Sequence, residues 1–143
     1  MDEKITKEVA RLDVERFLNA FKIDPIKRKK LSESIETLTE LLMFGMAVIT
    51  DDCHIKYILL EPIESTDGTV MLSELTFKNK RTRLDDLKGV QTGSEIDKVK
   101  ALVELMTGAN KAILGKITGD DFMYINEIAC FFLPAQSKLT EKA

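Results

Sequence analysis

Apolar residues recur every three or four positions through the first third of the chain, with charged residues between them. One stripe predicts a helix over residues 3–22, and a second predicts a helix from Pro25 toward Gly45. Asp24 is a suitable N-cap before Pro25, so a short turn should join the two helices. We therefore expect a helical hairpin over residues 1–50, with stripes wide enough to contact more than one neighbour.

The pattern changes to that of strands over residues 55–77. Two apolar runs, residues 55–60 and 69–77, flank a polar segment that contains Pro62 and ends near Gly68, as in a β-hairpin. Proline cannot donate to a strand ladder, so the first strand should stop pairing at Pro62. A bulge near residues 73–74 would bring both apolar pairs of the second strand to one face.

Helical signals return after the hairpin. Thr82, Ser94 and Thr118 are each followed three residues later by an acid, which is typical of a capped helix start. Gly108 should end the middle helix, and Pro134 should stop the last one.

These elements predict a mostly helical α+β fold with an N-terminal helical hairpin, one antiparallel β-hairpin and C-terminal helices. We expect the hairpin of helices over residues 1–50, a second region over residues 51–134 and a flexible tail over residues 135–143. The 143 residues, of which 44% are hydrophobic, are enough for one core.

Charge and cysteine content narrow the class of protein. The net charge of -3 is near neutral, and the two cysteines lie far apart, which favours free thiols in a reducing compartment. No apolar run approaches the roughly 18 residues of a membrane span, and the N-terminus lacks a signal-peptide pattern. We expect a protein of the cytoplasm with no membrane span.

Candidate catalytic and metal-binding residues are sparse. Cys53 and His54 are adjacent, but no further ligands stand at metal-site spacing. The acid pairs at residues 85–86 and 120–121 stand at predicted helix starts, where capping explains them better than acid catalysis. We therefore expect no enzyme activity, no metal and no cofactor.

Two basic runs leave a second interpretation open. Residues 27–30 (KRKK) and 78–83 (KNKRTR) could contact nucleic acid, which would make the chain a small nucleic-acid-binding regulator. The simpler interpretation is a solvated helix turn for the first run and a charged strand edge for the second. We favour the simpler one.

Some apolar residues could contact another protein instead of the core. The candidate partner-binding residues are Leu38, Leu42, Phe122, Phe131 and Phe132. Their alternative role is ordinary core packing. A contact role would suit a homo-oligomer or a protein client.

Several short motifs follow one another in a specific order. They are YILLEPI at 57–63, DG at 67–68, LSELTF at 72–77, LDDL at 84–87, TG at 107–108 and ITGDDF at 117–122. This order resembles the small tail assembly chaperone family of Mu-like and P2-like contractile-tailed phages. The resemblance covers about residues 55–133 and leaves out the N-terminal third. It departs from the family at Thr82, where members usually have proline.

The resemblance implies a role in assembly. Members of that family are thought to bind the long helical tape measure protein in the host cytoplasm while the tail is built. They keep it soluble until tail tube subunits polymerise round it, and they are generally absent from the finished virion. The tape measure protein is thus the expected partner of this chain, with the tail tube protein as a further candidate.

Overall fold

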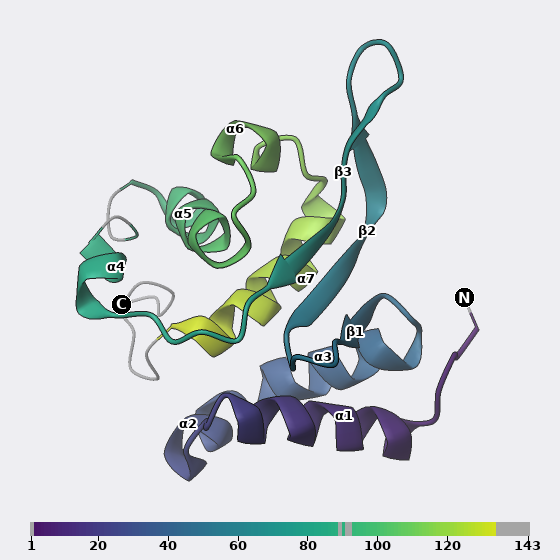
Figure 1. Cartoon of the computed structure of the whole chain (residues 1–143), viewed down its shortest axis with the longest axis vertical. Helices are drawn as coiled ribbons and strands as arrows, with labels where there is room; N and C mark the ends of the chain where they lie inside the picture. The colour runs from purple at the N-terminus through teal and green to yellow at the C-terminus, as the bar shows by residue number, and fades with distance from the viewer. Residues whose placement is uncertain (1, 89, 91–92, 134–143) are drawn as a thin grey trace.

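Helices cover one face of a short antiparallel sheet in the computed structural model, which describes residues 2–88, 90 and 93–133 (Figure 1). The mixed α+β fold predicted from the sequence is confirmed. The elements in chain order are α1 (Lys7–Ala20), α2 (Pro25–Lys30), α3 (Ser32–Met43), β1 (Ala47–Ile49), β2 (Ile55–Glu64), β3 (Val70–Phe77), α4 (Leu84–Lys88), α5 (Glu95–Thr107), α6 (Lys111–Leu114), α7 (Gly119–Ala129) and the 3-10 turn η1 (Cys130–Phe132).

The sheet has three strands in the order β1-β2-β3, so the predicted single β-hairpin is incomplete. Strand β1 pairs antiparallel with β2, with Ala47 opposite Tyr57. Its three residues are too few for an alternating pattern to be recognised in the sequence. The predicted boundary between residues 50 and 51 falls between these two paired strands.

The pairing of β2 with β3 is irregular near its middle. Ile58 pairs with Glu74 and Ile63 pairs with Leu72, so residues 59–62 of β2 lie opposite Ser73 alone. The irregularity is where the sequence predicted it, but the surplus residues belong to β2. Pro62 lies within this surplus, so pairing is interrupted there as predicted, but the strand resumes at Ile63 and does not end at Pro62.

Helix starts mostly follow their predicted caps. The side chains of Asp24, Ser94 and Thr118 each accept a backbone N–H three residues on. Thr82 is not a cap, because its hydroxyl donates to the Phe132 carbonyl at 3.0 Å. The predicted second helix is divided at Leu31 into α2 and α3.

Phenylalanine rings join the two ends of the chain in one core. Phe17 of α1 and Phe21, the residue directly after α1, pack against Phe132, with ring centroids 6.2 and 5.1 Å away. Phe132 also stacks on Phe77 of β3 at 6.0 Å. Residues 134–143, which include the predicted helix stop and tail, lie outside the described residues.

Within the described residues, no helix has the length and apolar character needed to cross a bilayer.

Candidate functional site

Four of the five predicted partner-binding residues lie in the core. Leu38, Leu42, Phe131 and Phe132 are each at most 3% exposed. A side chain enclosed on all sides offers no surface to a partner, so the contact role does not fit these four. The physical reason is that α1 and the sheet cover the stripes that the sequence left without a neighbour.

The fifth residue, Phe122, lies at the surface and is half-buried. It lines a groove between α5 and α7 of about 190 Å³ together with Ile96, Val99 and Asn126. On its other side, Phe122 contributes to a small apolar hollow that α6 closes with Leu114. Phe122 therefore lines both the groove and the apolar hollow.

Apolar side chains are exposed in this groove and next to it on α7. Ile96 of α5 is 58% exposed and Met123 of α7 is 53% exposed. Exposed Glu95 and Asp120 stand near the starts of the same two helices. An apolar floor with charged flanks between two helices is the shape that receives the apolar face of an amphipathic helix.

The position of Ile96 is fixed by the hydrogen bonds that cap the start of α5. Ser94 and Asp97 form a capping box, in which each side chain accepts the other residue's backbone N–H at 3.2 Å. The side chains of Val99 and Val103 are buried in the core. Ile96 lies on the same face of α5 one turn earlier, where its side chain is exposed.

Helix α7 is held in place by a buried carboxylate. Asp121 is fully buried and accepts hydrogen bonds from the Tyr57 hydroxyl at 2.6 Å and the Leu60 N–H at 2.8 Å. It also accepts the Glu61 N–H at 3.2 Å. These N–H groups belong to the irregular part of β2, so Asp121 replaces missing ladder partners. Burial, followed by the hydrogen bond to Asp121, raises the pKa of the Tyr57 hydroxyl.

The role of Asp121 was missed in the sequence. The pair Asp120–Asp121 was interpreted as helix capping, and Asp121 does accept a hydrogen bond from the Thr118 hydroxyl at the start of α7. Its further bonds to Tyr57 and β2 join residues far apart in the chain, so no local sequence signal indicated them. Because Phe122 follows Asp121 directly, this anchor also fixes the floor of the groove.

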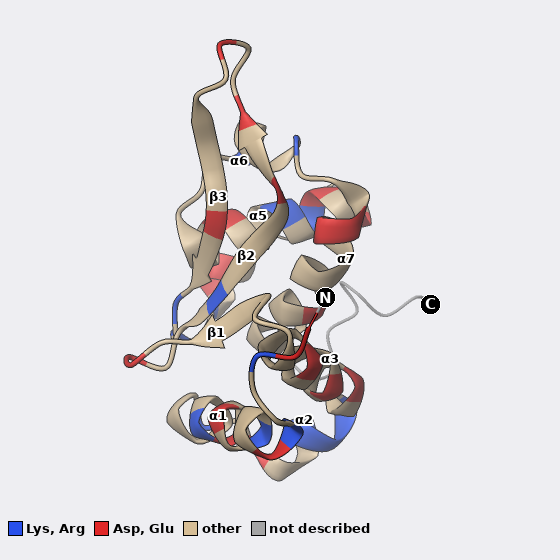
Figure 2. Ribbon diagram, turned by 90° about the vertical axis from the view of Figure 1, so that its right-hand side faces the viewer, with Lys and Arg blue, Asp and Glu red and all other residues tan. Residues whose placement is uncertain are grey.

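A second apolar surface lies on the sheet. In Figure 2 the strands stand in front of α5 and α6, and the face toward the viewer carries no helix. Val48, Ile58 and Leu60 are partly exposed on this face. The pair Lys56–Glu74, with its charged atoms 3.9 Å apart, lies among them. This face carries an ion pair among its apolar side chains.

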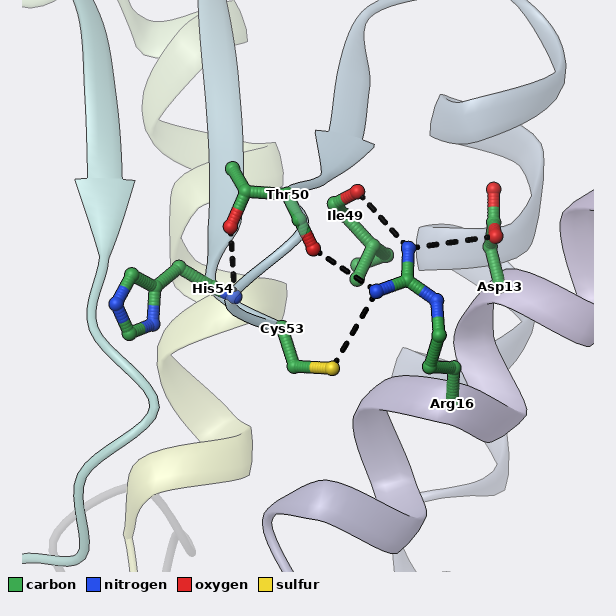
Figure 3. A network of polar contacts seen from close by, with 6 residues as sticks. All are labelled: Asp13, Arg16, Ile49, Thr50, Cys53 and His54. Carbon is green, nitrogen blue, oxygen red and sulfur yellow. Dashed lines mark hydrogen bonds and ion pairs between the residues drawn. The ribbon is translucent and has the colours of Figure 1, made fainter.

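Cys53 and His54 take part in a network that fastens the β1–β2 turn to α1 (Figure 3). The guanidinium of Arg16 donates to the Thr50 carbonyl at 2.9 Å, to the Ile49 carbonyl at 3.1 Å and to the Cys53 sulfur at 3.3 Å. His54 Nδ1 accepts the Asn79 N–H at 2.8 Å. Among the described residues, no group of three or more His, Cys, Asp or Glu could hold a metal ion.

The first basic run is a solvated helix turn only in its second half, where Lys29 and Lys30 are exposed, so that interpretation is wrong for Lys27 and Arg28. Lys27 is buried, and its ammonium donates to the Phe131 carbonyl at 2.8 Å. Arg28 donates to the Ile23 carbonyl at 3.0 Å and pairs with Glu15 at 3.2 Å. Both side chains are occupied by the fold, so only the rest of the run faces solvent.

No family model, curated protein or solved structure matches the chain. The resemblance to phage tail assembly chaperones therefore depends on the sequence motifs alone.

Proposed function

We propose that the chain is an assembly chaperone that holds an amphipathic helix of another protein in the groove between α5 and α7. The client we propose is the tape measure protein of a contractile-tailed phage, held in the host cytoplasm until tail tube subunits enclose it. In this proposal the chain catalyses no reaction and is absent from the finished virion.

The observation that carries the proposal is the exposure of Ile96 in the groove that Phe122 lines, with exposed Met123 next to Phe122 on α7. Exposed apolar side chains around a preformed groove are commonly binding surfaces, because water leaves them when a partner docks. The groove also lies within residues 55–133, the part that resembles the chaperone family. The choice of a tape measure client comes from that resemblance.

Co-expression with a helical fragment of a tape measure protein tests the proposal. We expect the fragment to stay soluble and to co-purify with the wild-type chain. The double variant Ile96→Ser/Met123→Ser should lose most of this co-purification, because it removes exposed apolar area from the groove and from the adjoining part of α7.

Leu12→Ser is the matched control, since Leu12 is 70% exposed on α1 and lies far outside the α5–α7 groove in the sequence. It should leave co-purification unchanged. A fragment that stays insoluble with the wild-type chain, or equal capture by the double variant, would contradict the proposal.

The alternative of a nucleic-acid-binding regulator gains little support from the geometry. It needs a basic face, but Lys27 is buried and Arg28 is engaged by α1. Arg81 of the second run donates to the Phe21 and Lys22 carbonyls. A mobility-shift measurement at low salt tests this alternative, and we expect no bound species.

Self-association remains part of the proposal, and the uncovered sheet face is the surface we assign to it. Ile58 and Leu60 would pack against the same residues of a second copy. Sedimentation velocity should show Ile58→Glu shifting the chain toward monomer. A wild-type chain that sediments as monomer at high concentration would contradict this part alone.

A further inference from the structure

A pocket of about 130 Å³ lies where the N-terminal helices meet the segment after β3. Two of its lining side chains are cations, Lys27 of α2 and Arg81 of the segment between β3 and α4. The others are Phe21, Thr82, Phe132 and Leu133. The pocket thus combines positive charge with apolar walls.

Lys27 reaches this pocket from inside the protein. Its side chain is about nine-tenths buried, with 9% of the residue exposed. Its ammonium lies 2.8 Å from the Phe131 carbonyl oxygen and 5.8 Å from the centre of the Phe21 ring. An ammonium has three protons, so the single carbonyl leaves donors for another acceptor.

Arg81 stands on the solvent side of the same ring. Its guanidinium carbon lies 5.3 Å from the Phe21 ring centre, and its Nη2 donates to the Phe21 carbonyl at 2.8 Å and to the Lys22 carbonyl. A guanidinium has five N–H donors, so three remain on Nε and Nη1 for the oxygens of a carboxylate.

The two cations, Lys27 and Arg81, have no carboxylate ion-pair partner among the described residues. The nearby Asp24 caps α2 by accepting the Lys27 backbone N–H at 2.9 Å. Burial, followed by Arg81, lowers the pKa of Lys27 to about 8, against the opposing effects of Asp24 and Cys130. Buried charges in proteins are ordinarily paired, so an anion would complete this arrangement.

We propose that this pocket binds a carboxylate carried on a small apolar group. Lys27 and Arg81 hold the carboxylate oxygens, and Phe132 and Leu133 contact the apolar part. The apolar walls favour such a ligand over inorganic phosphate, which needs a polar shell on all sides. The carboxylate can come from a free small acid or from the C-terminal end of a peptide, and neither source depends on the α5–α7 groove.

NMR titration of the full chain with isovalerate, acetate and phosphate, at equal ionic strength, tests the proposal. Isovalerate should shift the Thr82 and Phe132 amide signals saturably and more tightly than acetate, and phosphate should bind most weakly. The pKa of the Lys27 ammonium should rise when isovalerate is bound, because the carboxylate stabilises its charged form.

N-acetyl-leucine and its amide separate the two sources. Tighter binding of N-acetyl-leucine than of isovalerate supports a peptide end, and equal binding supports a free acid. Equal binding of the amide would overturn the proposal, because the amide carries no negative charge.

Two pocket variants and a neighbouring control complete the test. Arg81→Gln and Lys27→Met should each weaken isovalerate binding by about tenfold, which corresponds to losing one charge-assisted hydrogen bond. Lys30→Gln removes an exposed charge from the same helix and should change binding little. The proposal is overturned if no carboxylate gives a saturable shift, if phosphate binds most tightly, or if Lys30→Gln weakens binding as much as Arg81→Gln.

Discussion

The two ends of α7 carry similar aromatic stripes but meet different surroundings. After its C-terminal end, Phe132 of η1 is enclosed by Phe21, which follows α1, and by Phe77 of β3. At its N-terminal end, Phe122 lines the groove and Met123 is exposed to solvent. Helical periodicity therefore identifies an apolar face, but the number of elements that cover this face comes only from the tertiary fold.

The largest expected difference between the two ends is in stability. Phe132→Ala should lower the free energy of unfolding by about 3–5 kcal/mol, because a fully buried ring leaves a cavity. Phe122→Ala should cost less, about 1–2 kcal/mol, since part of its ring is in solvent. Urea denaturation of both variants gives the comparison, and equal losses would mean that the two ends are equally enclosed.

The second prediction concerns Asp121, which holds the N-terminal end of α7 against β2. Asp121→Asn should lower the free energy of unfolding by about 2–3 kcal/mol, because an amide NH₂ would face backbone donors of β2. Asp120→Asn is the neighbouring control, and it should cost less than about 0.5 kcal/mol at an exposed position. Chemical denaturation of the two variants measures the difference. Similar stability of both would show that Asp121 acts only near the helix start.

The third prediction is a pH dependence of stability that comes from Lys27, whose ammonium contacts Phe131 after the C-terminal end of α7. The pKa of Lys27 is lowered from 10.5 to about 8, so the folded chain loses this proton before the unfolded chain does. The cost of burying the charge is present in full below pH 8 and is relieved as pH rises toward 10.5.

The free energy of unfolding should therefore contain a contribution that rises from about pH 8 to about pH 10. Lys27→Met should lack this contribution, and Lys30→Gln should keep it. Denaturation series across this range, compared between the variants, provide the measurement. A parallel dependence in Lys27→Met and the wild-type chain would contradict the lowered pKa.

The smallest expected effect on stability is at the rim of the groove. Ile96→Ser should change the free energy of unfolding by no more than about 0.5–1 kcal/mol, because most of the side chain is already in water. Thermal unfolding should place this variant beside Leu84→Ser, another exposed position. A much larger loss would mean that Ile96 belongs to the core.

The sequence predicted the elements of regular length and their starts. The caps Asp24, Ser94 and Thr118 were predictable because each is a local interaction between a side chain and the next helical turn. Strand β1 was missed because three residues carry no period, and the surplus residues of β2 were assigned to the wrong strand. Local rules do not determine which partner strand absorbs extra residues.

The candidate site was only partly predictable. Phe122 was identified, but Leu38, Leu42, Phe131 and Phe132 were included with it because an uncovered stripe and a covered one look alike in sequence. The roles of Lys27 and Asp121 depend on contacts with residues about 60 to 100 positions away in the chain. Such pairs leave no local pattern.

Methyl NMR titration with the helical client fragment tests the central claim most directly, which is that the groove between α5 and α7 is the binding surface. We predict that the signals of Ile96, Val99 and Met123 shift in proportion to bound client, while those of Ile58 and Leu60 stay unchanged. Shifts confined to the sheet face, or no shifts at a client concentration that saturates co-purification, would contradict it.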